Sequence, residues 1–194
     1  MDESYRTFIA IELPREIRAR LAEHINQLRQ ALPNAAASWN REDNLHLTLK
    51  FLGNVPVEKI AELSNAVAMT ASQIEQFHLT VEGAGMFPPR GRAKVLWIGI
   101  EDPSGRLARL HTLLDDKCAK IGFARESRRF HPHLTIARLR KPDGARDLGE
   151  AHRTTGFPDS SFTVSEAVGF KSELLKTGAV HTPLFRHQLA TQQD

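Results

Sequence analysis

Three copies of one short motif are the strongest chemical signal in the sequence. His-Leu-Thr followed by an aliphatic residue occurs at His46, His78 and His133. An imidazole changes its protonation state near neutral pH, so it can take a proton from one group and give it to another. The threonine hydroxyl can donate a hydrogen bond to an anionic oxygen. A duplication or a simple preference for strands would give the same repeat without function, but the residue types indicate acid–base chemistry on an anionic group.

The spacing within the motif fits a β-strand. Side chains at i and i+2 of a strand face the same side, roughly 6.5–7 Å apart, so the histidine and threonine share one face while the aliphatic residues face a core. Two such strands side by side would place two imidazoles and two hydroxyls around a space that could hold a phosphate. One imidazole would take a proton from water while the other gives a proton to the leaving oxygen. A strained five-membered cyclic phosphate would need no metal.

The spacing alone does not say which two of the three motifs form the site. The segment His131-Pro132-His133 also places two histidines on one face of a strand, which is a possible start of a metal site. No Asp, Glu or Cys follows at a spacing that would complete it. We therefore expect no metal and no other cofactor, and we expect His131 to line the rim of the pocket or to tune His133.

The periodicity of apolar residues predicts the elements that must position these motifs. Alternation predicts strands, and apolar residues at steps of three and four predict helices. The expected strands cover residues 5–13, 45–52, 77–81, 95–100, 133–139, 162–170 and 181–189, and the expected helices cover 15–32, 57–74 and 107–121. The polar stretch 141–158 leaves room for one more short helix. Strands interleaved with helices, in two halves of similar order, predict an α+β fold of two sheet-and-helix lobes.

Composition and charge narrow the class of protein. The chain has 194 residues, of which 41% are hydrophobic and 25% charged, and no apolar run is long enough to cross a bilayer. The single cysteine, Cys118, excludes an intramolecular disulfide and is expected to be a buried thiol in a helix. With no signal-peptide core at the N-terminus, we expect a cytoplasmic protein without membrane contact, monomeric in solution.

The net charge of +3 is modest, but the positive charges are clustered. One cluster comprises Arg125, Arg128, Arg129, Arg138, Arg140 and Lys141, and a second comprises Arg90, Arg92 and Lys94. Solvated strand ends would explain any single one of these residues equally well. Together they favour a phosphate-bearing partner, and the small net charge favours a nucleic-acid end or a nucleotide over a long duplex.

The sequence resembles a known family at these motifs and their flanks. The segments RTFIAIELP, NLHLTLKFLG, GMFPPRGRAKVLWIGI and FHPHLTIAR are similar to the 2H phosphoesterases, in particular to their RNA 2′,3′-cyclic phosphodiesterase branch, once called 2′-5′ RNA ligases. The resemblance covers almost the whole chain. It implies one bilobal domain over residues 1–194, with two small antiparallel sheets backed by helices and a central cleft between them.

The resemblance also assigns roles by position. It implies that His46 is the general acid and His133 the general base, and that Thr48 and Thr135 hold the phosphate oxygens. It makes His78 an ordinary strand residue. The implied substrates are RNA ends or nucleotides that carry a 2′,3′-cyclic phosphate, and the implied product is a 2′-phosphate. Ligation of tRNA halves through a 2′-5′ bond, or nucleotide binding without catalysis, are the alternatives.

Several residues near the motifs are possible substrate contacts. Phe51 is a candidate for stacking on a base. Trp39 and Phe87 are further candidates, although aromatic residues of this kind more often belong to a core. Arg129 and Arg138 are candidates for contact with phosphate, as is Arg41. On a regular strand Arg138, five residues after His133, would point to the face opposite the histidine.

Overall fold

The computed structural model describes residues 3–139, 144–176 and 178–191. In these residues nine strands form two antiparallel sheets, and four α-helices pack on them. Arg140 and Lys141 of the predicted basic cluster lie outside the described residues. The α+β class and the arrangement of two helix-backed sheets, predicted from the sequence, are confirmed.

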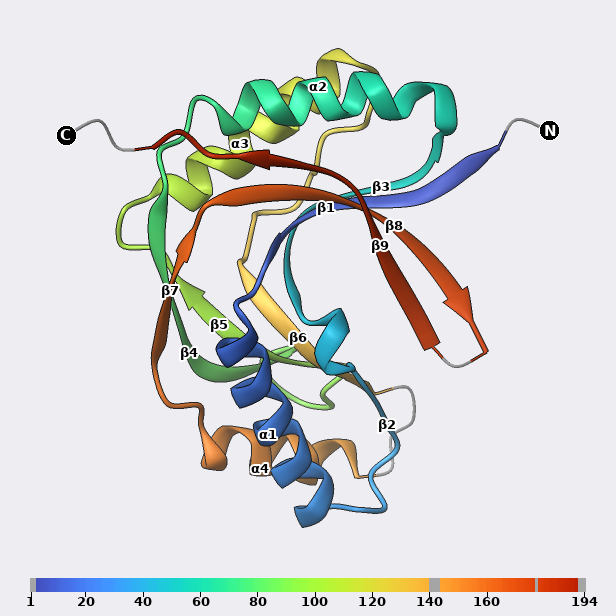
Figure 1. The fold of residues 1–194 in the computed structure, drawn as a ribbon. Coiled ribbons are helices and arrows are strands. Elements are labelled where there is room, and N and C mark those ends of the chain that lie inside the picture. Colours follow the sequence, from blue (N-terminus) through green and yellow to red (C-terminus); the bar gives the residue numbers. More distant parts are fainter. Residues whose placement is uncertain (1–2, 140–143, 177, 192–194) are drawn as a thin grey trace.

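The first sheet has the strand order β3-β1-β8-β9. Its strands are β1 (Ser4–Glu12), β3 (His46–Pro56), β8 (Glu166–Leu175) and β9 (Gly178–Gln188). Helices α2 (Ile60–Ala71) and α3 (Arg106–Lys120) pack against each other and cover this sheet, as Figure 1 shows. Cys118 is fully buried on the inner face of α3, as predicted, and burial raises the pKa of its thiol to about 11.

The second sheet has the order β2-β6-β5-β4-β7. Its strands are β2 (Ala37–Trp39), β4 (Phe77–Phe87), β5 (Val95–Glu101), β6 (His133–Leu139) and β7 (Ser160–Val164). Helices α1 (Arg15–Ala31) and α4 (Ala145–Thr155) pack on this sheet (Figure 1). Each lobe therefore takes one helix from the first half of the chain and one from the second half.

The apolar residues of both sheets join one hydrophobic cluster. It includes Ile9 and Leu47 from the first sheet and Leu96 and Leu134 from the second, all with no more than a trace of exposed surface. A separate small cluster of Phe8, Ala10, Val168 and Phe170 covers the other face of the first sheet. The first sheet is thus apolar on both faces near its centre. In the part of the chain that the structure describes, no helix is both long enough and apolar enough to span a bilayer.

One sequence prediction about a strand was wrong, and one strand was missed. Residues 162–170 are not one strand, because the chain leaves the second sheet after Val164 and enters the first sheet at Glu166. The carbonyl of Ser165, at the crossing, accepts a hydrogen bond from the Leu189 amide (2.8 Å). Two consecutive polar residues, Ser165 and Glu166, interrupt the alternation at this break, and the prediction of a single strand overlooked this interruption. The three-residue strand β2, which pairs with β6, is too short to show any alternation.

Candidate active site

His46 begins strand β3, one residue beyond the short 3₁₀ turn η1 (Glu42–Asn44). Its Nδ1 lies 2.8 Å from the carbonyl oxygen of Asn44. Its ring stacks on Phe8 with 4.7 Å between the ring centroids, and the edge of His181 meets it at 5.4 Å. The Asn44 side chain donates a hydrogen bond to the Ala179 carbonyl on β9 (2.8 Å), which fixes the turn that holds the imidazole.

His133 begins strand β6 and is held in the same way. Its Nδ1 lies 2.7 Å from the carbonyl oxygen of His131, again two residues earlier in the chain. Phe87 contacts the ring edge to face at 5.2 Å, and Trp97 lies at 6.3 Å. Each motif histidine is therefore fixed by one backbone carbonyl and packed against aromatic rings.

These contacts determine which nitrogen of each ring is available. A carbonyl oxygen can only accept, so Nδ1 of both His46 and His133 must carry a hydrogen. When the rings are neutral, each Nε2 therefore keeps its lone pair and can take a proton. Burial and, to a smaller extent, the neighbouring His181 lower the pKa of His46 to about 4, against a smaller opposing effect of Glu12. Burial also lowers the pKa of His133.

The two motif strands contact each other, one from each sheet. Thr48 and Thr135 follow their histidines at i+2 and share the half-buried face, while the residues between them are buried. Within the described residues neither hydroxyl has a hydrogen-bond partner. Both hydroxyls are therefore available to a ligand on the same face as the imidazoles.

A β-bulge follows each motif threonine, and it changes which later side chains reach this face. The register of β3 against β1 shifts between Thr48 and Lys50, and that of β6 against β5 shifts between Thr135 and Ala137. Both strands then show the same burial pattern, with two consecutive buried residues after the threonine. The residue at His+5 thus returns to the histidine face.

Because of this bulge, the prediction that Arg138 lies on the face opposite His133 was wrong. A regular strand would place it opposite His133, but Arg138 lies exposed on the same face, and its charge contributes to the lowered pKa of His133. On β3 the equivalent position is Phe51, which is 66% exposed and 5.9 Å from Phe8 between ring centroids. Arg129 is exposed in the loop before β6.

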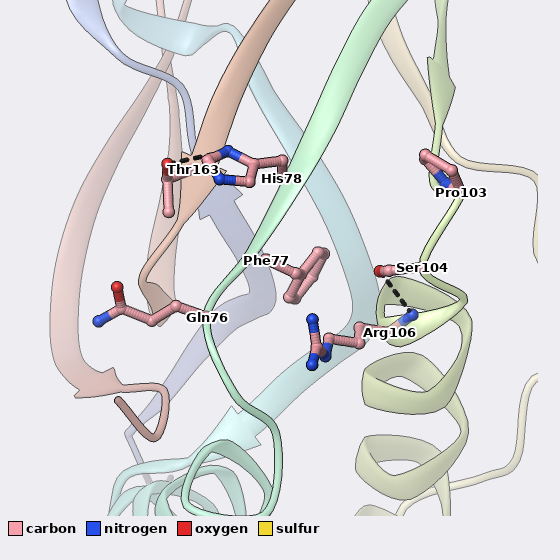
Figure 2. Close-up of a pocket in the computed structure, with 7 residues that line it drawn as sticks. All are labelled: Gln76, Phe77, His78, Pro103, Ser104, Arg106 and Thr163. Atoms are coloured by element: carbon pink, nitrogen blue, oxygen red, sulfur yellow. Dashed lines mark hydrogen bonds between the residues drawn. The ribbon is translucent and has the colours of Figure 1, made fainter. Parts of the chain in front are cut away.

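His78 lies on β4, which is separated from the third motif's strand β6 by β5 in the second sheet, whereas the first motif belongs to the first sheet. The His78 side chain is exposed on β4 opposite β7, where its Nδ1 lies 3.2 Å from the Thr163 hydroxyl. Figure 2 shows it at a surface pocket of about 490 Å³ together with Ser104 and Arg106. Neither His46 nor His133 lines this pocket. The structure therefore brings the strands of the first and third motifs together and leaves the middle one apart.

Sequence reasoning missed the residues that support the histidines. His181, on β9, contacts both His46 and Phe8, and its Nδ1 is buried without a partner among the described residues. Phe170 stacks on Phe8 at 5.2 Å and completes the aromatic support. The alternation of strands β8 and β9 marks these residues only as sheet residues. Both residues lie far from the His46 motif in the sequence, so no local pattern indicated that they contact it.

The possible metal pair at His131 gains no support from the side chains around it. His131 packs against Trp97 and Phe87, at 5.1 and 5.3 Å between ring centroids. Among the residues that the structure describes, no three His, Cys, Asp or Glu side chains gather closely enough to hold a metal ion.

Comparison with known proteins agrees with this geometry. The family model of the 2′-5′ RNA ligase superfamily matches residues 14–173. An RNA 2′,3′-cyclic phosphodiesterase from Escherichia coli K12 is 35% identical over 193 residues, which is 97% of this chain and 99% of the relative. One from Thermotoga maritima is 33% identical over 184 residues, covering 94% and 95% of the two chains.

Solved structures show the same fold. A Thermus thermophilus protein, TT0787, matches with a TM-score of 0.80 at 26% identity, over 97% of this chain and all of that one. Escherichia coli LigT in complex with 3′-AMP matches with a TM-score of 0.74 at 34% identity, over 96% and 99%. With a family model that spans most of its length and relatives this similar, the chain belongs to the 2′-5′ RNA ligase superfamily, the 2H phosphoesterases.

Proposed function

We propose that the protein hydrolyses the terminal 2′,3′-cyclic phosphate of RNA to a 2′-phosphate, with His46 and His133 as the acid–base pair. The observation that carries this proposal is the shared geometry of the two motif strands. Each presents an imidazole with a free Nε2 and, two residues on, an unpartnered hydroxyl among the described residues. The names of the relatives agree with this activity.

The reaction follows from these groups. Water attacks phosphorus in line with the bond to the 3′ oxygen, and His133 takes one proton from that water at Nε2. The phosphorus–O3′ bond breaks, and His46 gives the proton on its Nε2 to the departing oxygen. The products are a 3′-hydroxyl and a 2′-phosphate, and proton exchange with solvent restores both rings. Thr48 and Thr135 donate to the non-bridging oxygens during this step.

The acid role requires His46 to gain a proton that the free protein does not hold at neutral pH. Its pKa of about 4 makes it neutral there. A bound phosphodiester brings a negative charge next to the ring and raises that pKa. We infer that substrate binding and protonation of the acid are coupled, so that the site is charged correctly only when it is occupied.

Phe51 and Arg138 complete the proposed substrate contacts. Both stand at His+5 on the histidine face, one exposed ring and one exposed guanidinium. Phe51 would stack on the terminal base, and Arg138 would contact the phosphate. Arg129, in the loop before β6, is a further candidate for phosphate contact.

We also propose that the whole chain forms a single domain. We expect the two lobes to fold as one domain over residues 1–194, because one hydrophobic cluster draws on both sheets. A cytoplasmic location and a monomeric state also stay predictions.

The test is hydrolysis of a short RNA with a 2′,3′-cyclic end, in the presence of EDTA. Wild type should release a 2′-phosphate end, and His46→Ala and His133→Ala should each lose roughly 10²–10⁴-fold in rate. His78→Ala is the matched control and should keep full activity. Loss of turnover in EDTA, or an equal loss in His78→Ala, would contradict the two-histidine mechanism.

The family name also suggests the reverse reaction. A second RNA with a 5′-hydroxyl end, added to the same assay, tests for a 2′-5′ ligated product. Ligation at a rate above hydrolysis would make the ligase the main activity, while binding without turnover of either substrate would indicate a binding module.

A further inference from the structure

A second surface pocket of about 520 Å³ lies between the loop from β4 to β5 and the helix α4. Its charged lining residues are Arg90 and Arg92 from the loop and Arg146, Glu150 and Arg153 from the helix. Four guanidinium groups thus face one carboxylate. Glu150 pairs with Arg153, with 3.0 Å between Nη2 and Oε2. Arg90 and Arg146, which have no carboxylate partner among the described residues, give this pocket, named here the arginine pocket, an excess of positive charge.

The helix adds to this positive field. Arg146 lies exposed in the first turn of α4, where the helix dipole is also positive. A cation at this end disfavours the helix, and Asp147 in the same turn offsets only one charge. At the Arg146 end of the arginine pocket, an anion would interact favourably with both the guanidinium group and the dipole.

The loop connects the arginine pocket to the catalytic histidine. It starts directly after Phe87, whose ring contacts His133 at 5.2 Å. The preceding residue, Met86, is buried on the other side of the strand and lies next to Gly149 of α4, where an added Cβ would meet its sulfur at 3.0 Å. The end of β4 therefore has the reaction centre on one face and the arginine pocket on the other.

The distances along the chain are short. Arg90 follows Phe87 by three residues, so their Cα atoms are at most about 11 Å apart. An RNA strand that leaves the reaction centre past Phe87 would meet Arg90 within a few nucleotides. Its next backbone phosphates would then reach the α4 side of the loop.

We propose that the arginine pocket binds a backbone phosphate of the RNA chain upstream of its cyclic end. This inference rests on the proposed function, since it assumes that the substrate is an RNA end. It makes the protein prefer an oligonucleotide to a single cyclic nucleotide. Multiple guanidinium groups on two elements suit a phosphate better than a base, because guanidinium forms paired hydrogen bonds to phosphate oxygens.

The test compares two substrates in the full-length protein. One is 2′,3′-cyclic AMP, which has no upstream backbone phosphate, and the other is a ten-nucleotide RNA with a 2′,3′-cyclic end. The double variant Arg90→Glu/Arg146→Glu should raise KM for the RNA at least tenfold and leave kcat/KM for cyclic AMP unchanged. The slope of log(kcat/KM) against log salt for the RNA should decrease by about 1 to 2.

Arg109→Glu is the matched control, because Arg109 is an exposed arginine on α3, over the other sheet. This variant should change neither KM nor kcat/KM for either substrate. If the double variant lowered kcat/KM equally for both substrates, or left KM for the RNA unchanged, the proposed role of the arginine pocket would be wrong. If wild type hydrolyses neither substrate, the proposed function itself is wrong and this inference with it. Hydrolysis of cyclic AMP by the double variant shows that the variant is folded.

Discussion

Binding of a cyclic phosphate should make the protein take up a proton. In the free protein both motif histidines donate Nδ1–H to a carbonyl and have a lowered pKa, so both are neutral at pH 7. General acid catalysis needs one of them charged. The protein must therefore take up the missing proton from the solvent when the substrate binds.

The magnitude follows from the pKa of His46. To raise it from about 4 to its ordinary value of 6.5 requires about 3 kcal/mol. An imidazolium and a phosphate 4 Å apart attract each other by about 4 kcal/mol at an effective dielectric constant of 20. One phosphate charge beside the ring is thus sufficient. Uptake of roughly half a proton or more per site is expected near pH 6.5.

Calorimetry measures this uptake directly. The ligand is 2′,3′-cyclic AMP, whose single charge does not titrate near neutral pH, and the protein is His133→Asn, which lacks the base and turns over slowly. Binding is measured in buffers of different ionisation enthalpy, and the slope of binding enthalpy against ionisation enthalpy gives the protons taken up. The double variant His46→Asn/His133→Asn is the control and should show none.

Two results would refute this reasoning. Equal binding enthalpies in all buffers would show that His46 is already charged in the free protein or never becomes charged. Uptake that persists in the double variant would place the proton on another group, for which the adjacent His181 is the first candidate. The mirror variant His46→Asn tests the other assignment. Uptake only in that protein would make His133 the acid.

Three further perturbations test the fold and the substrate contacts. The buried His24 lies 2.9 Å from His152 between ring nitrogens, and burial lowers its pKa to about 4, so His24 alone should lower the free energy of unfolding by about 3 kcal/mol as the pH drops from 6.5 to 4. Urea unfolding should show a smaller loss in His24→Leu, and an equal loss would contradict the assignment. Asp115→Leu leaves the buried Lys50 ammonium without its carboxylate at 2.5 Å and should cost about 3–5 kcal/mol in the same measurement, with recovery in Lys50→Met/Asp115→Leu. Phe51→Ala should raise KM for cyclic nucleotides several-fold without lowering the melting temperature, because its ring is 66% exposed, and an unchanged KM would exclude stacking on the base.

The sequence predicted the helices and most strands because their apolar periodicity is local. Helix α1 and strand β6 have nearly the expected limits. The break at Ser165 was missed because a two-residue polar interruption was read as part of one strand, although the pairing partners change there from β4 to β1 and β9. Which sheet a strand joins depends on contacts between distant segments, and a single alternating run contains no record of them.

The candidate site was likewise predictable from the sequence only where the pattern is local. The spacing of His and Thr within a motif predicts their common face, and the structure places them so. The choice of His133 over His78 needed the resemblance to a family, because all three motifs have equal spacing. His181 stayed hidden because β9 reaches His46 only through the order of the first sheet. Its chemistry depends on a neighbour 135 positions earlier in the numbering.

The β-bulge after each motif threonine extends the similarity of the two motif strands beyond the His-Leu-Thr repeat itself. A strand without a bulge would alternate, and the residue at His+5 would point into the core. Both motif strands place two buried residues in succession after the threonine, which turns position His+5 outward again. The first strand uses that position for Phe51 and the second for Arg138. Two nearly identical strands thus present the same acid–base and hydroxyl pair, then differ at one position, where an aromatic ring suits a base and a guanidinium suits a phosphate. The middle copy on β4 has a register shift as well, but between Glu82 and Ala84. The residue at His+5 on β4 is Gly83, which lies within this shift and has no side chain, so β4 presents no ring or guanidinium there even though it shares the motif.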